Sequence, residues 1–233
     1  MDAYTKYVWL YLIDSKAQAL FVFQSFKLYA EKQTGFSLLS IQTDNAKEFL
    51  CFKNFLFIHG ITHRLTCPHT HQQNGSIERK HKHIVDIGLT LLASSSLPMS
   101  FWGYAFTVVV TIINVLPTSV LHNSSPYQLL FNKKPDYSIY KIFGCACYPL
   151  LRPYNKHKMN LHSSLCGFLG YAPNHRGYIC LSPTSHIYIS HHVIFDEHVY
   201  PYALSPNPFI SVSSNNMSHS SSTPTLEVFP TVP

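Results

Sequence analysis

The sequence has little charge and few acids. Asp, Glu, Lys and Arg make up 12% of the 233 residues, while hydrophobic residues make up 46%. A chain of this composition buries a core, which excludes a protein that is disordered throughout. Only 11 acids face 17 bases, so the formal net charge is +6. An excess of bases favours a polyanionic partner, nucleic acid first; a solvated basic surface is the alternative.

Cysteine pairs and a signal peptide are also missing. The six cysteines form no C-x-x-C pair, so the spacing of a zinc or redox motif is absent. Asp2, Lys6 and Asp14 precede any long apolar run, unlike the start of a secreted protein. We therefore expect a reduced, intracellular protein.

The span between Asp86 and Lys133 contains no acid, lysine or arginine, which raises the question of a membrane segment. Its apolar part, FWGYAFTVVVTIINVLP (101–117), includes two threonines and Asn114. It is shorter than the run of about 20 apolar residues that a bilayer requires. A buried helix between Pro98 and Pro117 explains it better, so we expect no membrane partner.

Strand and helix patterns alternate over the first part of the chain. Strands are expected at 7–13, 37–43 and 61–66, and helices at 15–35, 49–60, from about 75, at 98–116 and at 126–131. The helix from Gly75 should bury Ile77, Ile84, Val85, Leu91 and Leu92. This alternation predicts an α/β domain over residues 1–135.

The pattern changes after Pro135. Short apolar runs separated by Gly, Pro, Asn and His predict a small antiparallel barrel over residues 142–201. The Ser-, Pro- and Asn-rich remainder, 202–233, predicts a disordered linker. A basic cluster lies near the barrel and consists of Lys133, Lys134, Lys141, Arg152, Lys156, Lys158 and Arg176.

Two carboxylates stand where catalytic acids would be expected. Asp44 follows the strand at 37–43, and Glu78 lies in the first turn of the helix from Gly75. Carboxylate oxygens suit Mg²⁺ or Mn²⁺, and two such ions can transfer a phosphoryl group. Lys82, one turn after Glu78, can hold a phosphate. A helix cap or a surface charge is the alternative for each acid.

The segment CPHTHQQNGSIERKHKH (67–83) contains two H-x-H pairs, His69/His71 and His81/His83. No cysteine pair matches them, so the spacing does not predict zinc. His81 and His83 alternate with Lys80 and Lys82, where protonated imidazoles can meet phosphate. The segment therefore indicates the rim of an active site.

A series of motifs resembles the integrase region of copia-type retrotransposon polyproteins. They are, in order, TDNAKEF, PHTHQQNGSIERKHKH, FWGYA, LPT, SPYQLLF, FGCACYPLLRPYNKHK, CGFLGYAPNHRGYICL and HHVIFDE. The resemblance implies an α/β ribonuclease H-like core with a D,D,E metal site, followed by a Src-homology-3-like barrel of the retroviral polymerase kind. Asp44 matches the second acid, Glu78 the third, and Lys82 a lysine that contacts DNA.

The same resemblance implies an activity and its partners. These are 3′-end processing and strand transfer with Mg²⁺ or Mn²⁺, acting on element ends and target DNA, by a homo-oligomer in the nucleus or a cytoplasmic particle. Together with the basic clusters, it gives a set of expected DNA-binding residues: Gln73, Asn74, Arg79, Lys80, Lys82, Lys156 and Lys158.

The first acid of the family has no match, because DAYTKYVWLYLI resembles the family's third strand and neither Asp2 nor Asp14 fits the position. We therefore expect a core that lacks its first strands and an incomplete metal site without integration activity. Two alternatives stay open: a non-catalytic nucleic-acid-binding module built on the basic barrel, and a metal-dependent nuclease that uses Asp44 and Glu78 alone.

Overall fold

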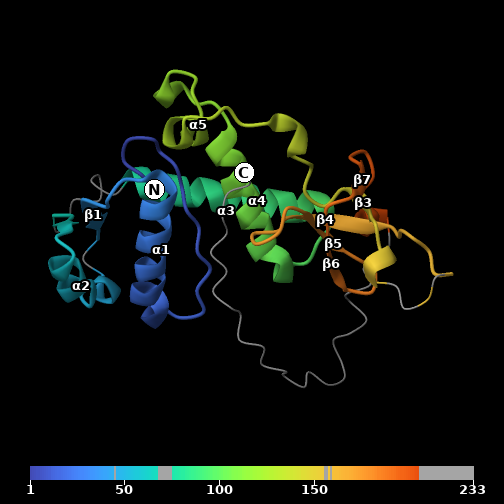
Figure 1. Cartoon of the computed structure of the whole chain (residues 1–233), viewed down its shortest axis with the longest axis horizontal. Helices are drawn as coiled ribbons and strands as arrows, with labels where there is room; N and C mark the ends of the chain where they lie inside the picture. Colours follow the sequence, from blue (N-terminus) through green and yellow to red (C-terminus); the bar gives the residue numbers. More distant parts are fainter. Residues whose placement is uncertain (45, 68–74, 155–156, 158, 205–233) are drawn as a thin grey trace.

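The computed structural model describes residues 1–44, 46–67, 75–154, 157 and 159–204. Most of the predicted linker, 205–233, lies outside the described residues. Helix α1 and the pair β1–α2 lie on one side of the molecule, and the sheet β3–β7 lies on the other (Figure 1). Helices α3 and α4 run between these two parts (Figure 1).

The elements follow the chain in a simple order. The longer helices are α1 (Ala19–Thr34), α2 (Phe52–Ile58), α3 (Gly75–Ser95), α4 (Trp102–Val115), α5 (Pro126–Phe131) and α6 (Pro201–Leu204). The strands are β1 (Ser40–Thr43), β2 (Thr62–Leu65), β3 (Ala146–Pro149), β4 (Cys166–Tyr171), β5 (Tyr178–Leu181), β6 (Ile187–Ser190) and β7 (Val193–Asp196). Short 3-10 turns are η1 (Lys16–Gln18), η2 (Lys47–Phe49), η4 (Met99–Phe101), η5 (Ser119–Leu121), η6 (Tyr137–Ile139) and η7 (Arg152–Tyr154).

The strand predicted at 7–13 is wrong. This segment is extended but pairs with no strand of the described part of the chain. Its buried backbone is satisfied by a side chain instead: the Val8 N–H donates to Asn114 Oδ1 at 2.9 Å, and Asn114 Nδ2 donates to the Val8 carbonyl at 2.8 Å. The sequence pattern of an apolar, β-branched segment does not show whether its backbone hydrogen-bonds to a neighbouring strand or to a side-chain amide.

The first two strands form a short parallel pair. Ser40 in β1 lies opposite Thr62 in β2, and Thr43 lies opposite Leu65. The predictions at 37–43 and 61–66 are therefore confirmed with shorter bounds. A cluster around Phe52, Leu56 and Ile61 packs α2 against α1 and β1.

Helices α3 and α4 pack closely along their lengths. Ile84 of α3 contacts a cluster with Val109, Val110 and Ile113 of α4. The predicted burial of Ile77 is wrong, since its side chain is 41% exposed. Ile77 lies in the first turns of α3, and burial against α4 begins only at Ile84.

Helix α4 is largely apolar because it packs against three different clusters. It contributes Val109 to the cluster with Ile84, Val108 to the core of the β3–β7 sheet, and Val115 to a cluster with Tyr7 and Tyr127. The buried helix expected between Pro98 and Pro117 is confirmed. Within the described ranges, no helix is both long and apolar enough to cross a bilayer.

The second part of the chain is a five-stranded antiparallel sheet in the order β6-β5-β4-β3-β7. Its core residues Phe168 and Leu181 share one apolar cluster with Leu92 of α3 and Val108 of α4. The core is therefore continuous across the predicted boundary at 135–142. Four cysteines of this region are free and buried, and burial raises the pKa of the Cys145 thiol to about 12.

The linker was predicted to begin at residue 202, and this start is wrong. Residues 201–204 form α6, and Tyr202 lies buried against the sheet. The Tyr202 hydroxyl lies 3.0 Å from the carbonyl of Leu181 and 2.9 Å from that of Ser182. Burial of the Tyr202 ring therefore keeps this segment on the sheet, which the polar composition of the predicted linker did not indicate.

Candidate functional site

Asp44 lies directly after β1, at the edge where the parallel pair ends, and is exposed. Its Oδ1 accepts a hydrogen bond from the Ala46 N–H at 3.3 Å. The Thr43 hydroxyl donates to the Asp44 carbonyl at 2.9 Å and lies 2.8 Å from His63 Nε2 on β2. Because the hydroxyl proton is used, His63 Nε2 is the donor in this contact. The strand ends thus hold the Asp44 backbone in place.

A lysine and a second acid lie near Asp44 and were missed from sequence. Lys16 Nζ forms an ion pair with Glu48 Oε1 at 2.9 Å. The hydrogen bond to Glu48 and then its charge raise the pKa of Lys16, and the charge of Asp44 adds a smaller contribution. The hydrogen bond from Lys16 lowers the pKa of Glu48. Glu48 stands in the same motif as Asp44, but no local signal brings in Lys16.

Glu78 is exposed in the first turn of α3, where a negative charge favours the helix dipole. Lys82 follows one turn later on the same face and is exposed. Arg79 is exposed too, and its guanidinium lies 3.3 Å from the position that a Cβ on Gly75 would take. Lys80 is half-buried. The start of α3 therefore presents one acid among several bases.

The donor set is small. Within the described parts of the chain, no group of three or more His, Cys, Asp and Glu side chains is placed to hold a metal ion. Mg²⁺ binds through one or two carboxylates together with water, so Asp44 and Glu78 fit one such ion by their chemistry. A pair of ions requires more donors than these two side chains supply.

Four predicted DNA-binding residues, Gln73, Asn74, Lys156 and Lys158, lie outside the described residues, and their roles stay predictions. The basic cluster near the barrel is divided by its surroundings. Its exposed members are Lys133, Lys134, Arg152 and Arg176. Lys141 instead pairs with Glu197 at 3.5 Å and lies over the Phe195 ring at 5.7 Å.

Comparison with known proteins finds similarity along the whole chain. The family model of the retroviral polymerase SH3-like domain matches residues 145–208. The retrovirus-related Pol polyprotein from transposon RE2 of Arabidopsis thaliana is 43% identical over 235 residues, which covers 100% of this chain and 16% of that protein. The Pol polyprotein from transposon RE1 of the same plant is 45% identical over 204 residues, covering 87% of this chain and 14% of that protein.

A solved structure is similar at lower identity. The HTLV-2 integrase catalytic core domain in complex with magnesium, in its trimeric form, aligns with 56% of this chain and 80% of its own length, with a TM-score of 0.43 and 21% identity. Against the polyproteins, the chain spans only 16% and 14% of the relatives' lengths.

Proposed function

Because this chain belongs to the retrovirus-related Pol polyproteins of transposons, we propose that it is part of their integrase. Its first 135 residues would be the ribonuclease H-like core, and the SH3-like domain would follow from residue 142. The observation that supports this best is the sequence relation along the entire chain. Asp44 at a strand end and Glu78 at a helix start are the side chains that would carry this chemistry.

The proposed chemistry is phosphoryl transfer on DNA. Asp44 and Glu78 would hold a divalent ion, Mg²⁺ or Mn²⁺, which when bound polarises a phosphodiester oxygen and activates water or a 3′-hydroxyl. The Ala46 N–H and the end of β1 orient the Asp44 carboxylate. Lys82, exposed one turn after Glu78, would bind the phosphate of the DNA strand.

We expect no strand transfer from a polypeptide of these 233 residues alone. Asp2 does not match the position of the family's first acid, and its Oδ2 is held in a local turn, accepting hydrogen bonds from the Thr5 N–H at 2.6 Å and the Thr5 hydroxyl at 2.7 Å. The measurement is joining of a labelled donor-end duplex to target DNA with Mn²⁺. Joined product above the level of an Asp44→Asn variant would show that the site is complete.

Duplex DNA binding is expected to depend on the start of α3. The double variant Arg79→Ala/Lys82→Ala removes two exposed bases, and loss of two phosphate contacts should reduce the salt slope of log K by about 1.8. Fluorescence anisotropy with a labelled duplex from 50 to 200 mM salt measures this slope.

A charge-matched control and a rival variant make the result specific. Lys32→Ala/Lys53→Ala removes two exposed bases from α1 and α2 and should leave the slope unchanged. The alternative function, a binding module on the barrel, predicts instead that Lys156→Ala/Lys158→Ala gives the larger loss. If the α3 variant binds like the unmodified chain, DNA contact through α3 is wrong.

The proposal also covers assembly and place of action. A homo-oligomer that holds two element ends, and action in the nucleus or in a cytoplasmic particle, follow from the family alone. Sedimentation of the chain with and without element-end DNA tests the first of these: a monomer under both conditions would contradict it.

A further inference from the structure

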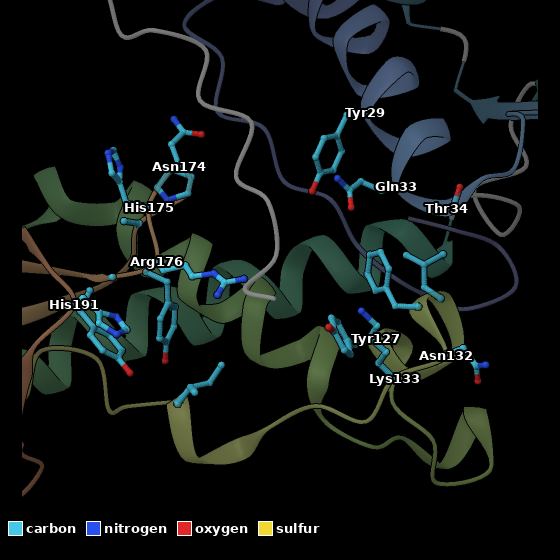
Figure 2. Close-up of a pocket in the computed structure, with 18 of the residues that line it drawn as sticks. Tyr29, Gln33, Thr34, Tyr127, Asn132, Lys133, Asn174, His175, Arg176 and His191 are labelled. Carbon is cyan, nitrogen blue, oxygen red and sulfur yellow. The ribbon is translucent and has the colours of Figure 1, made fainter.

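A groove of about 1150 Å³ lies away from Asp44 and Glu78. One wall is the end of α1, the second is α5 with the residues that follow it, and the third is the turn between β4 and β5 (Figure 2). None of its lining residues comes from β1, β2 or α3. It is therefore separate from the proposed catalytic edge.

The groove has basic side chains and no acidic side chain among its described lining residues. Lys133 and Arg176 line it from opposite parts of the chain, together with His175 and His191. Lys133 and Arg176 are exposed, and neither forms an ion pair with a described residue. Figure 2 shows the Arg176 side chain extended into the gap toward α1 and α5. Bases facing one hollow without carboxylates attract a polyanion.

Aromatic rings accompany these bases. Phe36, just after α1, lines the groove with 77% of its surface exposed. Tyr29 is half-buried on α1, and its ring is directed into the gap (Figure 2). Tyr178 lines the opposite wall. Phe36 thus presents an exposed face on which a flat group can stack, whereas the Tyr178 ring also packs against Phe195, with 4.9 Å between the ring centroids.

We propose that this groove binds a single-stranded segment of nucleic acid. Single-strand binding has two components: basic side chains that follow the phosphate backbone, and aromatic faces on which unpaired nucleobases stack. A duplex could contact the basic side chains through its phosphates. Its nucleobases could not stack on the aromatic rings, because their faces are stacked inside the double helix. A small ligand is a poorer fit, since such pockets measure roughly 300–1,000 Å³ and are mostly apolar.

The test compares two probes on the full 233-residue chain: a fluorescein-labelled single-stranded oligonucleotide and the duplex of the same sequence. The groove variant is Lys133→Ala/Arg176→Ala. Loss of two contacts should reduce the single-strand salt slope by about 1.4 and weaken binding about 10- to 30-fold near 0.1 M salt. The matched control, Lys134→Ala/Arg152→Ala, removes the same charge from exposed positions outside the groove.

Stacking has its own pair of variants. Phe36→Ala should weaken binding of the single-stranded probe about 5-fold or more. Phe57→Ala, which removes an 85% exposed ring outside the groove, should not. Both side chains are exposed, so both variants should fold.

The outcomes separate this inference from the α3 proposal. The inference is supported if the groove variants weaken binding of the single-stranded probe and leave duplex binding unchanged, while Arg79→Ala/Lys82→Ala weakens duplex binding. The inference is overturned by any of three results. The control pair weakens single-strand binding as much as the groove pair, the groove pair lowers the affinity for both probes by the same factor, or Phe36→Ala leaves single-strand binding unchanged.

Discussion

Replacing Gly144 with alanine is expected to lower the free energy of unfolding by about 2–6 kcal/mol. Gly144 has φ +78°, a conformation that costs a side-chain-bearing residue about 1–3 kcal/mol. A Cβ at this position would overlap the Ser95 Cβ, far inside contact distance. Overpacking of this kind costs about another 1–3 kcal/mol.

Neither side of the contact can move easily. The Gly144 N–H donates to the Phe168 carbonyl at 2.8 Å, which fixes its backbone to β4. Ser95 is fully buried, and its hydroxyl donates to the Leu91 carbonyl at 2.7 Å. Urea unfolding of the chain, followed by circular dichroism, measures the difference.

Gly35→Ala is the matched control, because Gly35 has a similar φ of +73° and nothing within 4 Å of its Cβ position. It should lose only the backbone part. In a double-mutant cycle, Ser95→Gly should return part of the stability that Gly144→Ala removes. Equal losses for the two glycine variants would show that the close approach to Ser95 carries no energy.

This contact joins α3 to the sheet. Ser95 ends α3, and Glu78 lies in the first turn of the same helix. Gly144 immediately precedes the residues that match the SH3-like domain. The close approach of Ser95 and Gly144 therefore packs the sheet against the end of the helix that carries the proposed DNA-binding bases at its start.

The features that could be predicted from sequence have local signals. Helix α1 follows a 3-10 turn whose cap is Ser15, with its Oγ accepting from the Ala17 N–H at 3.2 Å, and it ends at Gly35 in the left-handed conformation. The short runs between turn residues predicted the antiparallel sheet. The positions of Asp44 and Glu78 at element ends followed from the bounds of β1 and α3.

The features that could not be predicted depend on partners distant in sequence. Lys133 and Arg176 were recognised as basic, but their positions on one groove depend on how α5 packs near the β4–β5 turn. The Lys16–Glu48 pair likewise joins separate elements. Asn114 was noted only as a polar residue in an apolar helix, and sequence gave no sign that its amide replaces a strand.

Replacing Asn114 with alanine is the second change with a large expected effect. Asn114 is fully buried, and its amide satisfies both the N–H and the carbonyl of Val8, which is itself buried. Each buried backbone group left without a partner costs about 1–3 kcal/mol. We expect Asn114→Ala to lower the free energy of unfolding by about 2–6 kcal/mol, measured by urea unfolding.

The matched control lies one turn earlier on α4. The Thr111 hydroxyl donates only within its own helix, to the Thr107 carbonyl at 2.9 Å, so Thr111→Val should cost less than about 1 kcal/mol. Hydrogen exchange adds a local measurement, because the Val8 amide should lose protection in Asn114→Ala and keep it in Thr111→Val. If the Val8 amide exchanges at the same rate in both variants, the segment at 7–13 is held by its apolar side chains and not by the Asn114 amide.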